Sequence, residues 1–141
     1  MAPFLFLLGG TAVLRLLGLV GVDALDAWQP AVRGGLALML VVTGLAHFVP
    51  PKRGELVAMV PPRLPRAELL VTVTGALELV GAVGLLIPPV APFAAAALAL
   101  LMLAMFPANV SAARRGLPVT PLPTRIALQA VFVGAAVAAA L

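Results

Sequence analysis

Residues 66–110 read RAELLVTVTGALELVGAVGLLIPPVAPFAAAALALLMLAMFPANV. This stretch consists of two apolar runs, and the prolines at positions 88 and 89 separate them. A helix of about 20 residues is about 30 Å long, which is the thickness of the hydrocarbon core of a bilayer. Because proline is tolerated at helix ends but not in helix interiors, the stretch predicts two antiparallel membrane-spanning helices joined by a tight turn.

The composition of the whole chain agrees with this prediction. Of the 141 residues, 63% are hydrophobic and 10% are charged, and the mean hydropathy is +1.19. Soluble globular domains carry about 25% charged residues. The chain lacks the alternating segments of about ten residues that are typical of membrane β-barrels. We therefore expect an all-α, polytopic transmembrane helical bundle.

Prolines and charged residues divide the rest of the chain in the same way. We expect a single transmembrane domain over residues 1–141, with five helices at about residues 3–22, 31–49, 66–87, 90–110 and 122–141. The first run has Arg15 in its middle and no basic residue before it, which favours a retained span over a cleaved signal peptide. Residues 54–60 are compatible with either a short interfacial helix or an irregular basic loop.

The basic residues predict the orientation of the spans. One side carries six of them, in the loops after the second and fourth spans: Lys52, Arg53, Arg63, Arg66, Arg114 and Arg115. The other side carries Arg33 beside Asp23 and Asp26. Because positive charge accumulates in cytoplasmic loops, we expect a cytoplasmic N-terminus and an external C-terminus. The net charge of +4 comes from these same loop clusters, which are typical of membrane topology. No nucleic-acid partner is therefore expected.

The sequence predicts a layer of polar residues near the middle of the membrane, from the number of residues between each of them and the start of its span. Arg15 and Glu78 each lie twelve residues after the start of their spans, or about 18 Å into the membrane. A buried charge there costs at least about 2.5 kcal/mol, so each residue needs a partner. We expect a buried polar network of Arg15, Glu78, Thr43 and Thr74, with the Arg15–Glu78 pair at its centre. Three alternatives remain: a structural ion pair, a pair that also contacts a ligand or proton path, and no pairing.

A shallower layer lies within about 10 Å of the cytoplasmic surface. It contains His47, Asn109, Arg125 and Gln129, which we expect to line one pocket as candidate ligand-binding residues. The competing interpretations are a hydrogen-bonded structural histidine and an arginine that reaches the lipid headgroups. A metal site is not expected, because the chain has one histidine and no cysteine. No catalytic motif is present, so no catalytic residue is assigned.

Several segments together resemble a known family. They read GLALMLVVTGLAHF (35–48), MVPPRLP (59–65), VTGALELVGAVGLLIP (73–88), LMLAMFPANV (101–110) and TRIALQ (124–129). In this order they resemble the DoxX family of small bacterial membrane proteins, over roughly residues 33–133. The resemblance rests on residues spread through these segments: Gly44, His47, Phe48, Pro61, Pro62, Pro65, Gly75, Glu78, Gly81, Gly84, Pro107, Asn109, Arg125 and Gln129. It implies a four-helix bundle in the cytoplasmic (inner) membrane, to which this chain adds its first helix.

The resemblance also implies classes of function. DoxX takes its name from a membrane subunit associated with a thiosulfate:quinone oxidoreductase, so our first hypothesis is an accessory subunit that docks a redox partner protein or holds a quinone-like lipid. Animal relatives imply the second hypothesis, a chaperone or cargo receptor for membrane or exported proteins. Lipid or solute transport is the third, although no inverted repeat is visible. In each case the lipid bilayer is a partner, and the chain is expected not to be an enzyme by itself.

Overall fold

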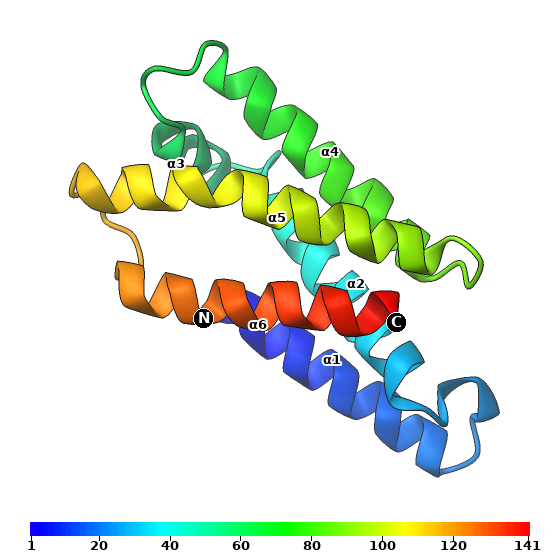
Figure 1. The fold of residues 1–141 in the computed structure, drawn as a ribbon. Coiled ribbons are helices and arrows are strands. Elements are labelled where there is room, and N and C mark those ends of the chain that lie inside the picture. Colours follow the sequence, from blue (N-terminus) through cyan, green and yellow to red (C-terminus); the bar gives the residue numbers. More distant parts are fainter.

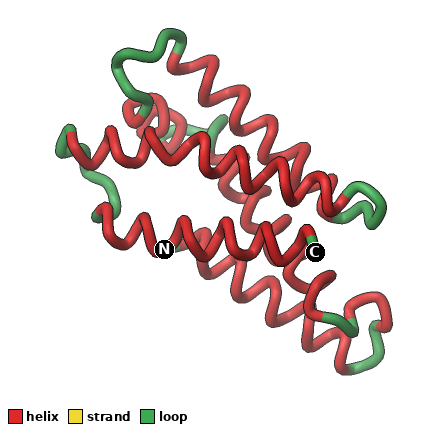
Figure 2. Tube along the Cα trace, in the orientation of Figure 1, coloured by secondary structure: helices red, strands yellow, loops and turns green.

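The computed structural model describes residues 1–141 and consists of helices joined by short turns (Figures 1 and 2). The elements are α1 (Ala2–Leu19), η1 (Asp23–Leu25), α2 (Trp28–Ala46), α3 (Lys52–Met59), α4 (Ala67–Leu85), α5 (Ala91–Arg114) and α6 (Leu122–Ala140). All but η1 and α3 are long and apolar enough to cross a membrane. The predicted all-α bundle with five spans is therefore confirmed.

The ends of α1 and α5 have the same local structure. Gly21 and Gly116 adopt positive φ angles of 114° and 67°, which glycine tolerates because it has no Cβ. After each glycine the chain turns back, so that Val22 N–H donates to the Leu17 carbonyl and Leu117 N–H to the Ala112 carbonyl. This Schellman arrangement places the helix ends at Leu19 and Arg114, whereas the sequence predicted residues 22 and 110.

Helix α2 is the central helix of the bundle. It packs against α1, α4 and α6, while α5 lies between α4 and α6. Four leucines from these helices are fully buried and fill the interior: Leu36, Leu40, Leu85 and Leu98. Around them, most of the buried residues are alanines and glycines. Small residues let helices approach closely, which matters in lipid because burying apolar surface between helices gains little there.

The close approach of α2 to α4 depends on Gly75. A Cβ atom at Gly75 would overlap the side chain of His47, which directly follows α2. Gly35 has the same role where α2 crosses α1, since a Cβ there would overlap Thr11 and the Leu7 carbonyl oxygen. The backbones can therefore touch only because these positions have no side chain.

Residues 52–59 form a short helix, α3, so the irregular-loop alternative is wrong for this segment. Arg115, directly after α5, donates hydrogen bonds to the carbonyl oxygens of Ala58, Met59 and Val60, at 2.7, 2.9 and 3.3 Å. The last carbonyls of a helix have no partner within the helix. The Arg115 guanidinium thus provides hydrogen-bond donors for the carbonyl groups at the end of α3 and links α3 to the end of α5.

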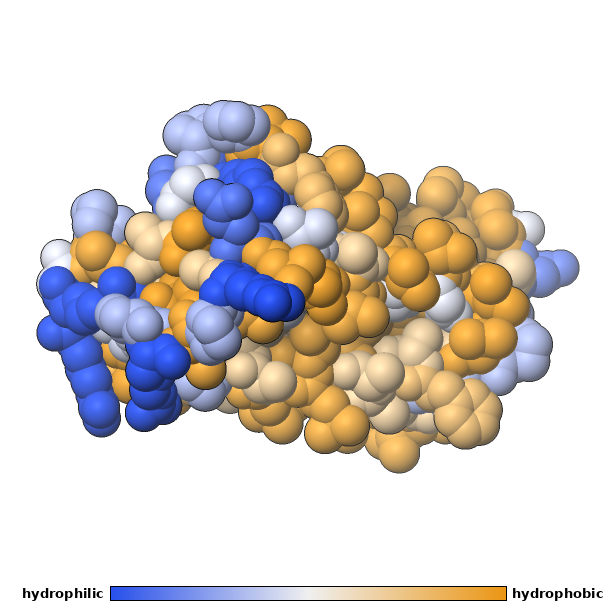
Figure 3. Space-filling model, turned by 90° about the horizontal axis from the view of Figure 1, so that it is seen from above, coloured by the Kyte–Doolittle hydropathy of each residue, from blue (hydrophilic) through white to orange (hydrophobic).

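The surface has the polarity of a membrane protein. Large apolar side chains are exposed along the spans, among them Val80 (70% exposed) and Phe93 (77%). Figure 3 shows hydrophilic side chains gathered mainly at one end of the molecule, with a continuous apolar surface beside them. This end contains α3, the α3–α4 loop and the α5–α6 turn (Figure 1), and we call it the basic end. The apolar belt supports a multi-pass membrane protein.

The close contact at Gly75 generates a prediction. Gly75→Ala should lower the free energy of unfolding by about 1 to 3 kcal/mol, because α4 must move away from His47. Gly134→Ala is the matched control, since Gly134 lies in α6 with open space around it. Thermal unfolding in detergent would measure both. Equal stability of the two variants would contradict the proposed packing role of Gly75.

Candidate functional site

Glu78 is the centre of a buried polar cluster between α2 and α4. The Thr43 hydroxyl lies 2.6 Å from Glu78 Oε2, within hydrogen-bond distance, and His47 Nε2 lies 4.0 Å from Glu78 Oε1. Thr43 lies in the last turn of α2 and His47 directly follows the helix four residues later, so both face α4. His47 is 4% exposed and Glu78 is 5% exposed, and they are the only fully buried polar residues. We call Thr43, His47 and Glu78 the α2–α4 cluster.

The backbone determines which nitrogen of His47 carries a proton. Nδ1 of His47 lies 2.9 Å from the carbonyl oxygen of Thr43. A carbonyl oxygen can only accept, so Nδ1 is assigned as the donor. In the neutral imidazole, Nε2 is then the unprotonated nitrogen, and it faces Glu78. The cluster therefore combines a carboxyl group, a hydroxyl group and the Nε2 atom of an imidazole.

The predicted contact between Arg15 and Glu78 is wrong. Arg15 Nη1 instead donates to Asp26 Oδ1 at 2.9 Å, and its guanidinium carbon lies 5.5 Å from the centre of the Trp28 ring. These partners belong to the turn between α1 and α2 and the start of α2. Arg15 is thus a residue of the end opposite to the basic end.

The error has a geometric cause. Equal depth would require α1 and α4 to begin at the same level, but their contacts with α2 show that the two helices are staggered. Gly44 of α2 lies against Glu78, while Gly34 of α2 lies against Leu14, the neighbour of Arg15. Ten residues of helix separate these two contacts, which places Arg15 roughly 15 Å from Glu78 along the bundle.

Thr74 also lies outside the α2–α4 cluster. Its hydroxyl donates to the carbonyl oxygens of Leu70 and Val71 in its own helix, at 2.8 and 3.1 Å. A threonine inside a helix often forms such a local bond. Of the predicted deep network, only Thr43 and Glu78 contact each other.

The predicted shallow layer is divided between two interfaces. Asn109 of α5 accepts a hydrogen bond from Arg125 of α6, whose Nε also donates to the Thr120 carbonyl at 3.0 Å. Gln129 lies on the same interface and donates to the Met102 carbonyl at 2.8 Å. His47 belongs to the α2–α4 cluster instead, so no hydrogen-bond network joins all four residues. Similar depth did not bring them together, because α2 pairs with α4 at this level while α5 pairs with α6.

Arg53 is a contact residue that the sequence identified only as a topology signal. Its guanidinium donates to the His47 carbonyl at 2.8 Å and to the Thr72 hydroxyl at 3.1 Å. It thereby joins α3 to the end of α2 and the first turns of α4. A basic residue after a helix is expected to reach the last carbonyls, which is the signal that could have found it.

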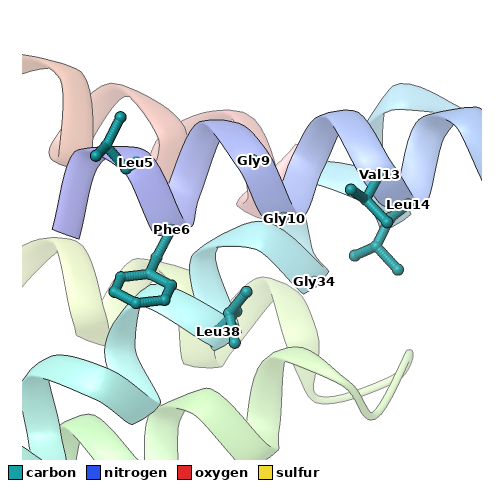
Figure 4. Close-up of a pocket in the computed structure, with 8 residues that line it drawn as sticks. All are labelled: Leu5, Phe6, Gly9, Gly10, Val13, Leu14, Gly34 and Leu38. Carbon is teal, nitrogen blue, oxygen red and sulfur yellow. The ribbon is translucent and has the colours of Figure 1, made fainter. Parts of the chain in front are cut away.

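Two of the surface cavities are candidate binding sites. The first has a volume of about 490 Å³ and is an apolar groove between α1 and α2 (Figure 4), lined by Leu5, Phe6, Gly9, Gly10, Val13, Leu14, Gly34 and Leu38. The second has a volume of about 360 Å³ and lies at the α5–α6 turn, lined by Ala113, Arg114, Leu117, Val119, Thr120, Pro121 and Leu122. We call it the α5–α6 cavity. No group of three or more His, Asp or Glu side chains is placed to hold a metal ion.

The Thr43 bond generates a stability prediction. Thr43→Val keeps the shape of the side chain but leaves Glu78 without its hydroxyl partner, so it should lower the free energy of unfolding by about 1 to 3 kcal/mol. Thr74→Val removes a hydroxyl that bonds only to its own helix and should change stability by less than about 0.5 kcal/mol. Thermal unfolding in detergent compares the two variants. A larger loss in Thr74→Val would contradict this assignment.

The chain matches one family of known proteins. No curated protein and no solved structure matches the chain. A family described as "Domain of unknown function (DUF8561)" matches residues 36–140. The match begins inside α2, so it includes the whole α2–α4 cluster and the α5–α6 cavity, while α1 lies before it. Since the matched region is most of its length, the chain belongs to the DUF8561 family.

Proposed function

We propose that this protein is a DoxX-like accessory subunit of the bacterial cytoplasmic membrane, which holds a quinone-like lipid for a redox partner protein. The observation that carries the proposal is the α5–α6 cavity. Its lining contains the Arg114 guanidinium, the Thr120 hydroxyl and several apolar side chains, and it lies where α5 ends and α6 begins. A ligand with a polar head and an apolar tail matches this combination.

The cavity offers donors to a quinone headgroup. Arg114 and Thr120 line it, and both side chains can donate hydrogen bonds to a quinone oxygen. Leu117, Val119 and Leu122 provide apolar contact for the ring. The volume of about 360 Å³ lies within the usual range of small-molecule sites, about 300 to 1,000 Å³.

The Asn109–Arg125 pair holds Thr120, one of the residues that line the cavity, in place. Arg125 holds the Thr120 carbonyl at 3.0 Å, and Asn109 holds Arg125. This pair fixes the turn that carries Thr120 and Pro121, so we assign it a positioning role. The groove between α1 and α2 is a poorer candidate for a quinone headgroup, because its lining contains no side chain that donates a hydrogen bond (Figure 4).

Ligand binding tests the proposal. A short-chain ubiquinone analogue should bind the detergent-solubilised protein in native mass spectrometry. Arg114→Gln should weaken binding roughly tenfold, since a charge-assisted hydrogen bond contributes about 1.5 kcal/mol or more. Arg63→Gln removes the same charge from an exposed loop position and is the matched control.

Two outcomes would count against the quinone proposal. The first is equal binding by the Arg114 and Arg63 variants, which would indicate that the analogue simply partitions into the detergent. The second is co-purification of an exported or membrane client protein without any quinone, which would favour the chaperone or cargo-receptor alternative.

The orientation in the membrane is the second testable part of the proposal. We propose that the basic end faces the cytoplasm, because it carries Lys52, Arg63, Arg66 and Arg114 as exposed residues. A reporter that is active only outside the cytoplasm should then be active when fused after Leu141 and inactive when inserted after Pro62. The reverse pattern would overturn the orientation and leave the fold unchanged.

A further inference from the structure

The α2–α4 cluster has a composition that the proposed function does not use. His47 and Glu78 are 5% and 6% exposed in their side chains, and they lie inside a membrane-spanning bundle. No salt bridge connects either of them to another residue. An isolated charge in such a place is costly, whereas a pair with no net charge is tolerated.

Proton counting then leaves two favourable states. The first is a neutral imidazole beside a protonated carboxyl, and the second is an imidazolium beside a carboxylate. Each has zero net charge, and each contains one proton more than the fully deprotonated pair. We infer that Thr43, His47 and Glu78 form a binding site for a single proton within the bundle. This inference stands apart from the quinone proposal, because it uses none of the residues of the α5–α6 cavity.

Thr43 gives the site a way to accept the proton at Glu78. The Thr43 hydroxyl lies 2.6 Å from Glu78 Oε2 and 3.4 Å from the Leu40 carbonyl oxygen. When Glu78 is a carboxylate, the hydroxyl donates to Oε2. When Oε2 is protonated, its own O–H donates to Thr43, and the hydroxyl proton turns to Leu40. The hydroxyl groups of Thr43 and of protonated Glu78 therefore have acceptors in both states, and only the Thr43 hydroxyl has to rotate.

His47 provides the second position for the proton. Its Nδ1 donates to the Thr43 carbonyl, so Nε2 is the nitrogen that gains or loses a proton. Nε2 and Glu78 Oε1 are 4.0 Å apart, which is longer than a hydrogen bond. A bridging water or a small rotation of either side chain closes this gap.

No other charged group competes for the site. Of the surrounding helices, α1, α5 and α6 each contain a single charged residue. Arg15 of α1 pairs with Asp26, and Arg125 of α6 bonds to Asn109. Arg114 of α5 is exposed at the surface. On α3, Lys52 pairs with Glu55, and Arg53 reaches only the backbone of His47 and Glu68 and the Thr72 hydroxyl. Arg33 of α2 bonds the end of α6, and Glu68 of α4 lies about 15 Å from Glu78 along the helix.

The buried site lies nearer to one end of the bundle than to the other. His47 directly follows α2 at the basic end, beside α3. On the opposite side, Leu36, Leu40, Leu85 and Leu98 are fully buried and fill the bundle. The shorter path for a proton therefore leads to the basic end, and the buried leucines block passage through the rest of the bundle. This arrangement fits a one-sided proton sensor and not a proton conduit.

A single histidine makes the test direct. His47 is the only histidine in the chain, so nitrogen NMR of ¹⁵N-histidine-labelled protein in lipid nanodiscs, purified without a histidine tag, reports on it alone. Infrared spectroscopy of the same sample reports whether Glu78 is a carboxylic acid, by the band that disappears in Glu78→Gln. Between about pH 6 and 8, we expect the two measurements to add up to one proton. Where the imidazole is neutral, its proton should be on Nδ1.

Two variants check that the groups depend on each other. Glu78→Gln should lower the fraction of charged His47 relative to the wild type, because the imidazolium loses its only neighbouring anion. Glu68→Gln, at the exposed start of α4, should leave the His47 spectrum as in the wild type. The histidine spectrum of the wild-type protein gives the charge and the tautomer of His47 without any variant, so this part of the test does not depend on the stability of Glu78→Gln.

The opposite results are equally clear. A neutral His47 beside an ionised Glu78, or two bound protons at about pH 7, would overturn the one-proton site. A neutral imidazole with its proton on Nε2 would overturn the assigned geometry.

Discussion

The contact of α2 with α1 and α4 is the constraint on which the rest of the structure depends. In lipid, apolar helices gain little by leaving one set of hydrocarbon groups for another, so association relies on close packing and a few polar bonds. Gly35 and Gly75 provide the close packing, because a Cβ atom at either position would overlap the neighbouring helix. The same approach brings His47 within 4.0 Å of Glu78 and thereby creates the α2–α4 cluster.

Arginines have a second role beyond orientation in the membrane. Three of them donate to carbonyl oxygens at the ends of helices: Arg33 to Ala139 in α6, Arg53 to His47 after α2, and Arg115 to the end of α3. These carbonyls lack partners within their helices and carry the negative end of the helix dipole. Arg33 and Arg115 thus connect elements that are distant in sequence, whereas Arg53 connects α3 to the helix that directly precedes it.

The two polar centres of the bundle differ in what surrounds them. The α2–α4 cluster is closed, and its groups contact only each other and the backbone. The Asn109–Arg125 pair is partly buried and stands behind an open cavity at the membrane surface. A closed cluster is suited to a proton, which needs no space, whereas an open cavity is suited to a small molecule. This difference separates the two proposals physically.

The sequence by itself determined the class of the fold, because apolar runs of about 20 residues in lipid have no alternative to helices. It also identified Glu78 and His47 as residues that require partners. Only the tertiary structure decided which partners they have. Depth along a helix can be counted from its ends, but the stagger between helices and the face that each presents depend on packing. Arg15 therefore lies far from Glu78, and His47 contacts Glu78 instead of Arg125.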